Sequence, residues 1–301
     1  MSAQALRAAA DEAVLSRLGR VGVAARHAVE SLLAGQHRSR RRGLSVEFAG
    51  HRPYQFGDDP RHLDWQVWAR TDRLDIRLYE EETRLRATLV VDASGSMAYG
   101  PAGRTKLDRA RLLAAGLACL MIAQRDAVGL ALIDDGVRRH LPPMATMAGL
   151  LHLLDALAEA PASGGTGVAA AVAALAPRLT RRGLVILISD GLDDPDAVAD
   201  ALRLLRHRRQ DVRVLLLADP DEESFPFQGM IEAVALEREP RLRVDADRIR
   251  PAYREALAAH RAALAERCHA AGAPLTPMRT DEDPAAALIR ALAGATAAER
   301  R

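Results

Sequence analysis

The chain has 301 residues, which is enough for one large domain or for a domain with extensions. Charged residues make up 27% and hydrophobic residues 49%, a composition that is typical of folded globular proteins and excludes a largely disordered chain. The formal net charge of +2 provides no overall field that would attract nucleic acid, so we expect no nucleic-acid partner. Lys106 is the only lysine among 42 basic residues, and we interpret the excess of arginine as codon usage.

The N-terminal segment predicts amphipathic helices and no export signal. Leucine and valine residues are spaced among charged residues in 3–34, which favours one or two helices. This segment lacks the apolar core of a signal peptide, and no apolar run elsewhere is long enough to span a bilayer. We therefore expect a cytoplasmic protein without a transmembrane segment. The arginine cluster at 38–42 favours a solvated or partner-facing loop, and the alternative is contact with an acidic lipid or a phosphate.

Residues 43–70 contain an unusual run of acidic, basic and aromatic residues with the core Gly-Asp-Asp-Pro-Arg-x-Leu-Asp-Trp-x-x-x-Ala-Arg. The carboxylates and guanidinium groups predict charge-assisted hydrogen bonds, with Trp65 and Trp68 burying the apolar side of the network. We interpret the network as a structural device that holds an N-terminal extension against the following domain, and the alternative is a second acidic site or a docking surface. The signature comprises Arg52, Gly57, Asp58, Asp59, Arg61, Asp64, Trp65 and Arg70.

A short apolar run at 87–91 predicts a strand that is buried on both faces, as in a parallel sheet. The run ends at Asp92, and Ser94 and Ser96 follow at alternate positions, with Gly95 permitting a tight turn. Three oxygen-bearing side chains therefore meet in one loop. Such oxygens are the ligands that hard cations prefer.

Two later stretches supply the same kind of group. Thr166 lies in the glycine-rich loop at 163–167, and Asp190 follows an apolar strand at 184–189. With Asp92, Ser94 and Ser96, these residues resemble the metal-ion-dependent adhesion site of von Willebrand factor A domains. The resemblance implies a Mg²⁺ or Mn²⁺ site formed by these five residues. Because Mg²⁺ prefers octahedral coordination, five ligands leave a position open, and the low charge of the set keeps the cation attractive to a partner's carboxylate.

The remaining pattern alternates helices with strands, which predicts an α/β fold with a doubly wound, mostly parallel sheet like that of von Willebrand factor A or Rossmann-like domains. The expected helices are 106–124, 145–159, 168–179, 195–208, 249–271 and 284–292, and the expected strands are 127–133, 137–141, 184–189, 212–218 and 231–236. We expect the last of these strands near the sheet edge. Asp134 and Asp135 precede Gly136, so we interpret them as hairpin-turn residues rather than as metal ligands.

The signature at 57–70, followed by Leu74, Arg77 and the glutamates at 80–82, resembles the family called domain of unknown function 58, which joins it to a von Willebrand A-like domain. We expect N-terminal helices and the family extension in 1–85, the von Willebrand A-like domain in 86–220 and a C-terminal extension of strand and helices in 221–301. The resemblance also implies association with AAA+ ATPases of the MoxR type. Many members of that family carry membrane segments, and we expect none in this sequence.

We expect a metal-dependent protein-interaction module rather than an enzyme, because no nucleophile-base pair is evident. The first alternative is a Mg²⁺-dependent phosphohydrolase using Asp92, but Ser94 stands where haloacid-dehalogenase-type phosphatases carry a second aspartate. The second alternative is a structural scaffold with a vestigial metal loop. The chain has no phosphate-binding loop of the Gly-x-x-x-x-Gly-Lys-Ser/Thr type, so ATPase activity would have to come from a partner.

Overall fold

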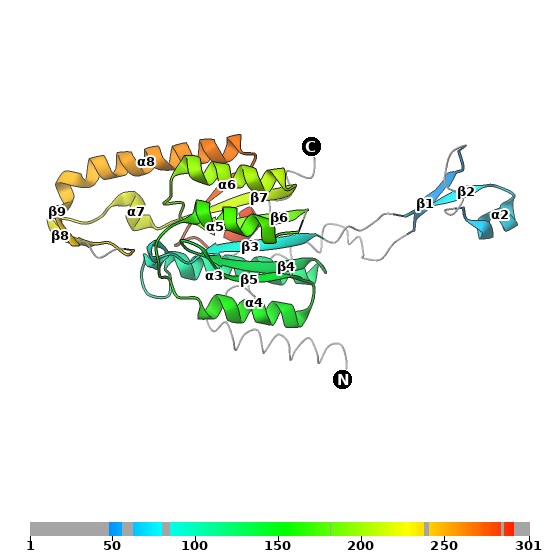
Figure 1. Cartoon of the computed structure of the whole chain (residues 1–301), viewed down its shortest axis with the longest axis horizontal. Coiled ribbons are helices and arrows are strands. Elements are labelled where there is room, and N and C mark those ends of the chain that lie inside the picture. The colour runs from blue at the N-terminus through cyan, green and yellow to red at the C-terminus, as the bar shows by residue number, and fades with distance from the viewer. Residues whose placement is uncertain are drawn as a thin grey trace. The chain divides into compact units, whose positions relative to one another are not determined.

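The computed structural model describes residues 48–55, 63–79, 85–180, 182–237, 241–283 and 286–291. These residues belong to two compact units: residues 48–79 lie in one and residues 85–291 in the other. The helices expected in 3–34 and the arginine cluster at 38–42 lie outside the described residues. Figure 1 labels the elements of both units.

The smaller unit contains a two-stranded antiparallel sheet and a short helix. Strand β1 (Phe48–Pro53) pairs with β2 (Asp75–Tyr79), and helix α2 (Trp65–Thr71) lies between them in sequence. Asp64 begins the helix: its Oδ1 accepts a hydrogen bond from Val67 N at 3.2 Å, and its own N donates to the Asp75 carbonyl at 2.8 Å. Asp64 therefore fixes the start of α2 and ties it to β2.

The larger unit is built on a six-stranded sheet with the strand order β10-β7-β6-β3-β4-β5. All neighbouring strands are parallel except β5, which returns antiparallel beside β4. This is the mostly parallel α/β sheet predicted from the sequence. The strands are β3 (Arg86–Asp92), β4 (Ala127–Ile133), β5 (Val137–Met144), β6 (Gly183–Ser189), β7 (Gln210–Ala218) and β10 (Leu275–Arg279).

Helices cover both faces of this sheet (Figure 1). Leu89 and Val91 of β3 pack into the apolar core beneath α3 (Lys106–Ala123) and α4 (Met147–Glu159), whereas Val90 packs into the core on the opposite face. The second core is completed by α5 (Val168–Leu175), α6 (Pro195–His207) and α8 (Ala246–Ala270). The central strands are apolar throughout because alternate side chains enter opposite cores.

Four short helical segments also belong to the larger unit. The 3-10 helix η2 (Gly95–Ala98) follows β3, and a second one, η3 (Ala176–Arg178), extends α5. Helix α7 (Pro220–Ser224) follows β7, and residues 286–291 are helical. Among the helices of the described ranges, none combines the length and the apolar character needed to cross a bilayer.

The C-terminal region differs from the prediction in its strands. The strand expected at 231–236 is β8 (Met230–Val234), but it pairs with β9 (Arg241–Asp245) in a separate antiparallel sheet instead of lying at the edge of the main sheet. That edge is formed by β10, which the sequence analysis missed. Its sequence, Leu-Thr-Pro-Met-Arg, is neither apolar nor strictly alternating, and proline is tolerated there because an edge strand has one unpaired side.

Candidate functional site

Three aspartates lie at the carboxyl ends of parallel strands. Asp92 ends β3, Asp190 follows β6 and Asp219 follows β7. Because β3 and β6 are parallel neighbours, Asp92 and Asp190 lie side by side at one edge of the sheet. All three side chains are buried. Ligands of doubly wound sheets bind at this edge, which makes it the candidate site.

Asp92 organises the loop that follows it. Its Oδ1 accepts a hydrogen bond from Ser94 N at 2.9 Å, and its Oδ2 accepts one from the Ser189 hydroxyl at 2.6 Å. The hydroxyl oxygens of Ser94 and Ser96 are 3.1 Å apart. The loop thus gathers the first three predicted ligands around a carboxylate that is 0% exposed.

Burial and the negative charge of nearby Asp190 raise the pKa of Asp92 to about 6. Hydrogen bonds from Ser189 and Ser94 act in the opposite direction, but they do not offset these two effects. At neutral pH Asp92 is therefore a buried anion whose own contacts are neutral donors. A cation placed beside it would be strongly favoured.

The glycine-rich loop places Thr166 next to the β3 loop. Ser163 N donates to the Ala93 carbonyl at 2.9 Å, and Gly95 N donates to the Gly164 carbonyl at 3.1 Å. Arg138 holds the loop from the other side, since its Nη1 donates to the Pro161 carbonyl at 2.8 Å. Sequence positions more than 60 residues apart thereby form one surface.

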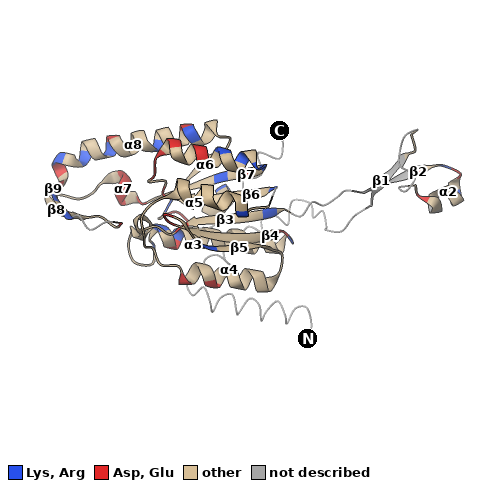
Figure 2. Ribbon diagram, viewed as in Figure 1, with Lys and Arg blue, Asp and Glu red and all other residues tan. Residues whose placement is uncertain are grey.

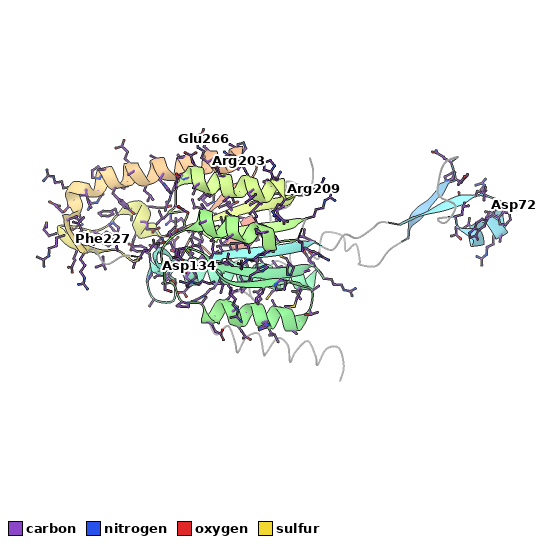
Figure 3. The ribbon with its side chains drawn as sticks, in the orientation of Figure 1. Asp72, Asp134, Arg203, Arg209, Phe227 and Glu266 are labelled. Carbon is purple, nitrogen blue, oxygen red and sulfur yellow. The ribbon has the colours of Figure 1, made fainter. Side chains whose placement is uncertain are left out.

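Asp134 is a turn residue, in agreement with the sequence interpretation. Its Oδ1 accepts from Gly136 N at 3.0 Å, and its Oδ2 pairs with Arg138. Figure 3 shows Asp134 near the strand ends. Asp134 therefore supports Arg138, which in turn supports the glycine-rich loop.

A glutamate that the sequence analysis did not single out reaches into the site. Glu237, which follows β8, accepts hydrogen bonds from Thr166 N at 2.9 Å and from Ser96 N at 3.3 Å, and a third from the Thr166 hydroxyl. Its carboxylate joins the β3 loop to the glycine-rich loop. Thr166, Ser96, Ser94 and Asp92 are consequently linked in one chain of contacts.

The second predicted aspartate, Asp190, pairs with a buried ammonium group. Lys106 Nζ lies 2.7 Å from Asp190 Oδ2 and 2.6 Å from Glu222 Oε1, and the lysine is fully buried. Burial lowers the pKa of Lys106, but the two ion pairs outweigh burial and raise the pKa above its ordinary value. Lys106 is therefore charged and balances part of the negative charge of the site.

Glu222 belongs to α7, whose acidic first turn is visible in Figure 2. Asp219 caps this helix: its Oδ1 accepts from Asp221 N at 3.0 Å, and its Oδ2 accepts from the Thr280 hydroxyl at 2.7 Å. The glutamate in turn accepts a hydrogen bond from Asp219 N at 3.1 Å, which completes a capping box. The cap thus aims Glu222 at Lys106.

The backbone after Asp190 is fixed by Gly191 and α8. Gly191 has φ +67°, and a Cβ at this position would lie 2.5 Å from Leu264 Cδ2. His260 Nε2 lies 2.8 Å from the Gly191 carbonyl, to which it donates a hydrogen bond. Only glycine combines this conformation with the close approach of α8.

A cavity of about 420 Å³ opens beside these groups. It is lined by Ser96, Tyr99, Lys106, Thr166, Leu192, Glu222 and the segment 234–237. The predicted ligands Ser96 and Thr166 therefore face a space that can admit a partner side chain.

The donor set suits a hard divalent cation. Among the described residues, no three acidic, histidine or cysteine side chains form a metal-binding cluster; the candidate ligands combine two carboxylates with three hydroxyl groups. Lys106 competes for Asp190, so direct coordination rests mainly on Asp92 and the hydroxyls. The site contains more carboxylates than cationic side chains. The carboxylates are those of Asp92, Asp190, Glu222 and Glu237, and the cations are Lys106 and Arg261. A divalent cation would balance the excess negative charge.

The predicted signature network is only partly described. Gly57, Asp58, Asp59 and Arg61 lie outside the described residues, Arg52 lies in β1, and Arg70 is exposed in α2. Trp65 and Trp68 contact each other edge to face at 6.0 Å and are 57% and 44% exposed, and the network that they are predicted to bury stays a prediction. Asp64 has a local structural role as the cap of α2.

Four residues of the site were not predicted from the sequence: Lys106, Ser189, Glu222 and Glu237. A signal existed for two of them: Lys106 is the only lysine of the chain, and Asp219-Pro-Asp-Glu222 has the pattern of a capping box after an apolar strand. No local pattern marks Ser189 or Glu237, because their contacts join segments that are distant in sequence.

Comparisons with known proteins give a consistent family match. The family described as "Protein of unknown function DUF58" matches residues 50–263. The uncharacterized protein Rv1480 of Mycobacterium tuberculosis (strain H37Rv) is 32% identical over 277 residues, covering 88% of this chain and 84% of that protein.

Solved structures give weaker matches. The conserved hypothetical protein BatB from Bacteroides thetaiotaomicron is 15% identical, with a TM-score of 0.48 over 71% of this chain and 99% of that chain. The VWA domain of SpRpn10 is 14% identical, with a TM-score of 0.35 over 69% of this chain and 95% of that chain.

Proposed function

This chain belongs to the DUF58 family of proteins of unknown function, and we propose that it is a protein-interaction module that depends on a divalent cation. The observation that carries the proposal is the buried Asp92 carboxylate, which lies beside the hydroxyls of Ser94 and Ser96 at the edge of a von Willebrand A-like sheet. This edge opens into a cavity that can receive a partner side chain.

In this proposal each group has a separate task. Asp92 provides the charge that holds Mg²⁺ or Mn²⁺, and Ser94, Ser96 and Thr166 provide neutral oxygens. Asp190, paired with Lys106, acts through the electrostatic field or through water. When bound, the cation would supply an electrophilic centre that attracts a partner's carboxylate.

The proposed partner is an AAA+ ATPase of the MoxR type. The residues themselves do not specify it; the resemblance of the signature at 57–70 and of the downstream domain to the family implies it. We propose no catalytic activity, because Ser94 stands where a phosphohydrolase of the haloacid-dehalogenase type carries its second aspartate.

Titration calorimetry with Mn²⁺ and Mg²⁺ tests the cation site directly. The full chain should bind Mn²⁺ saturably, and Asp92→Ala should lose this binding while keeping its circular dichroism spectrum. Asp200→Ala is the matched control, because Asp200 is an exposed aspartate on α6 and its removal should leave binding unchanged. Binding of a purified MoxR-type ATPase is then compared with Mn²⁺ and with EDTA.

The outcomes separate the alternatives. Saturable binding that Asp92→Ala removes, together with Mn²⁺-dependent binding of the ATPase, supports the proposal. The absence of cation binding in the wild-type protein overturns it and favours a scaffold in which Lys106 supplies the positive charge. Mn²⁺-dependent hydrolysis of a phosphate ester that Asp92→Asn abolishes would instead favour an enzyme.

A further inference from the structure

The carboxylate of Glu237 already lies in a receptor for carboxylates. Three donors from two separate loops converge on it: Ser96 N at 3.3 Å, Thr166 N at 2.9 Å and the Thr166 hydroxyl. Two of them are backbone amides, which are fixed donors for an anion. The three described donors of this receptor are all groups of the protein itself.

The backbone of Leu236, the residue before Glu237, lies against the loop that follows β3. A Cβ on Gly95 would lie 2.5 Å from the Leu236 carbonyl oxygen and 3.0 Å from Glu237 Cγ. Any larger residue at position 95 would push this segment away. The β3 loop thus leaves room for the backbone that carries the Glu237 carboxylate.

The hairpin that carries Glu237 is otherwise weakly attached. Strands β8 and β9 pair only with each other among the described strands, and Met230 and Leu242 are 72% and 62% exposed. In Figure 1 the hairpin lies on the side of the sheet where β3 ends. An isolated two-stranded hairpin is marginally stable, so release of Glu237 requires little other rearrangement.

We infer that Glu237 is an internal ligand that occupies the place of a partner's acidic residue, and that the partner docks through an acidic side chain preceded by an aliphatic one, as in Leu236-Glu237. This inference rests on the proposed interaction function and adds the chemistry of the partner segment. Leu236 lines the cavity together with Leu192, so Leu192 is the apolar surface that the partner's aliphatic residue would meet once the hairpin has left.

The internal ligand lowers the apparent affinity for an external one. A partner can bind only to the fraction of molecules in which Glu237 has left, so its apparent affinity is reduced by that fraction. A tethered ligand competes at an effective concentration that is on the order of millimolar for short links. Removing the Glu237 carboxylate should therefore expose the receptor and strengthen binding.

The probe is a fluorescein-labelled peptide with the sequence of residues 230–237, Met-Ile-Glu-Ala-Val-Ala-Leu-Glu, with a blocked C-terminus. In fluorescence anisotropy, Glu237→Ala should bind it at least about tenfold more tightly than the wild-type chain. Glu232→Ala is the matched control, because Glu232 lies in β8 of the same hairpin and pairs with Arg241 at the surface. A peptide ending in Gln should bind neither variant.

Amide exchange provides a second readout that does not depend on the peptide. The Thr166 amide should exchange faster in Glu237→Ala than in the wild type or in Glu232→Ala, and the peptide should restore its protection. Equal peptide affinity in Glu237→Ala and wild type, or unchanged exchange of Thr166, would overturn the inference. The calorimetric test with Asp92→Ala is independent of this hairpin, so loss of the internal-ligand role leaves the cation-dependent function standing.

Discussion

At the scale of single residues, the site is defined by which charges have partners. Lys106 lies between Asp190 and Glu222, whereas Asp92 receives hydrogen bonds only from neutral groups among its described contacts. Two carboxylates that look equivalent in sequence, each ending an apolar strand, therefore differ electrostatically. Asp92 is the one whose charge lacks compensation, which makes it the better candidate for direct contact with a cation.

The pH dependence of stability should report this difference. The pKa of Asp92 is raised from 3.8 to about 6, so the folded state binds this proton more tightly than the unfolded state. The resulting stabilisation is fully present below pH 3.8 and is lost as the pH rises through about 6. We expect metal-free Asp92→Asn to gain about 2 to 3 kcal/mol relative to wild type between pH 4 and pH 8, because asparagine cannot ionise. Urea unfolding at a series of pH values measures this gain.

Asp200→Asn is the control for that series, since its side chain is exposed on α6. Its stability should follow the wild type at every pH. A difference between Asp92→Asn and wild type that does not change with pH would show that Asp92 is already compensated by charge. Saturating Mn²⁺ should abolish the advantage of the variant at pH 8.

At the scale of elements, the site is positioned by contacts between loops and helices that the strands alone do not determine. Helix α8 passes over Gly191 so closely that Leu264 Cδ2 would lie 2.5 Å from a Cβ there, and Leu216 of β7 would lie 2.7 Å from it. His260 of the same helix binds the Gly191 carbonyl. The long C-terminal helix thus fixes the backbone that carries Asp190.

Gly191→Ala should therefore be strongly destabilising. Strain from the positive φ costs about 1 to 2 kcal/mol, and displacement of packed leucines adds about 1 to 3 kcal/mol. The matched control is Gly103→Ala: Gly103 also has a positive φ, +78°, but nothing lies within 4 Å of its Cβ position. Chemical denaturation of both variants separates the two effects, and equal losses would show that α8 does not restrict this loop.

At the scale of the whole molecule, the described chain forms two units, and the site lies entirely in the larger one. Both apolar cores are made of residues between 87 and 291, and all candidate ligands, Lys106 and Glu237 belong to this part. The signature segment contributes its own small sheet and helix. Folding of the site should therefore not require the signature.

A fragment of residues 85–301 tests this division. We expect it to unfold in one cooperative transition and to bind Mn²⁺ with the affinity of the full chain, because every described contact of the site is retained. Near-ultraviolet circular dichroism, denaturant titration and calorimetry would measure this. A fragment without cooperative unfolding would show that the first 84 residues contribute to the larger core.

The sequence by itself determined the α/β class, the two-faced burial of the central strands and most element boundaries. These depend on local signals: apolar runs such as 184–189, the turn at Asp134-Asp135-Gly136 and proline at the start of α6. The position of Asp92 at a strand end also follows from its local sequence. Such features are readable because each is encoded within a few neighbouring residues.

Only the tertiary structure decided how the charges of the site are paired and that Glu237 reaches into it. The pairing of Lys106 with Asp190 and Glu222 joins three segments, and the reach of Glu237 to Thr166 spans 71 positions. The same applies to β10, whose weak strand pattern is offset by pairing with β7. Long-range contacts of this kind depend on which segments the packed layers bring together. A single stretch of sequence does not record its distant partner.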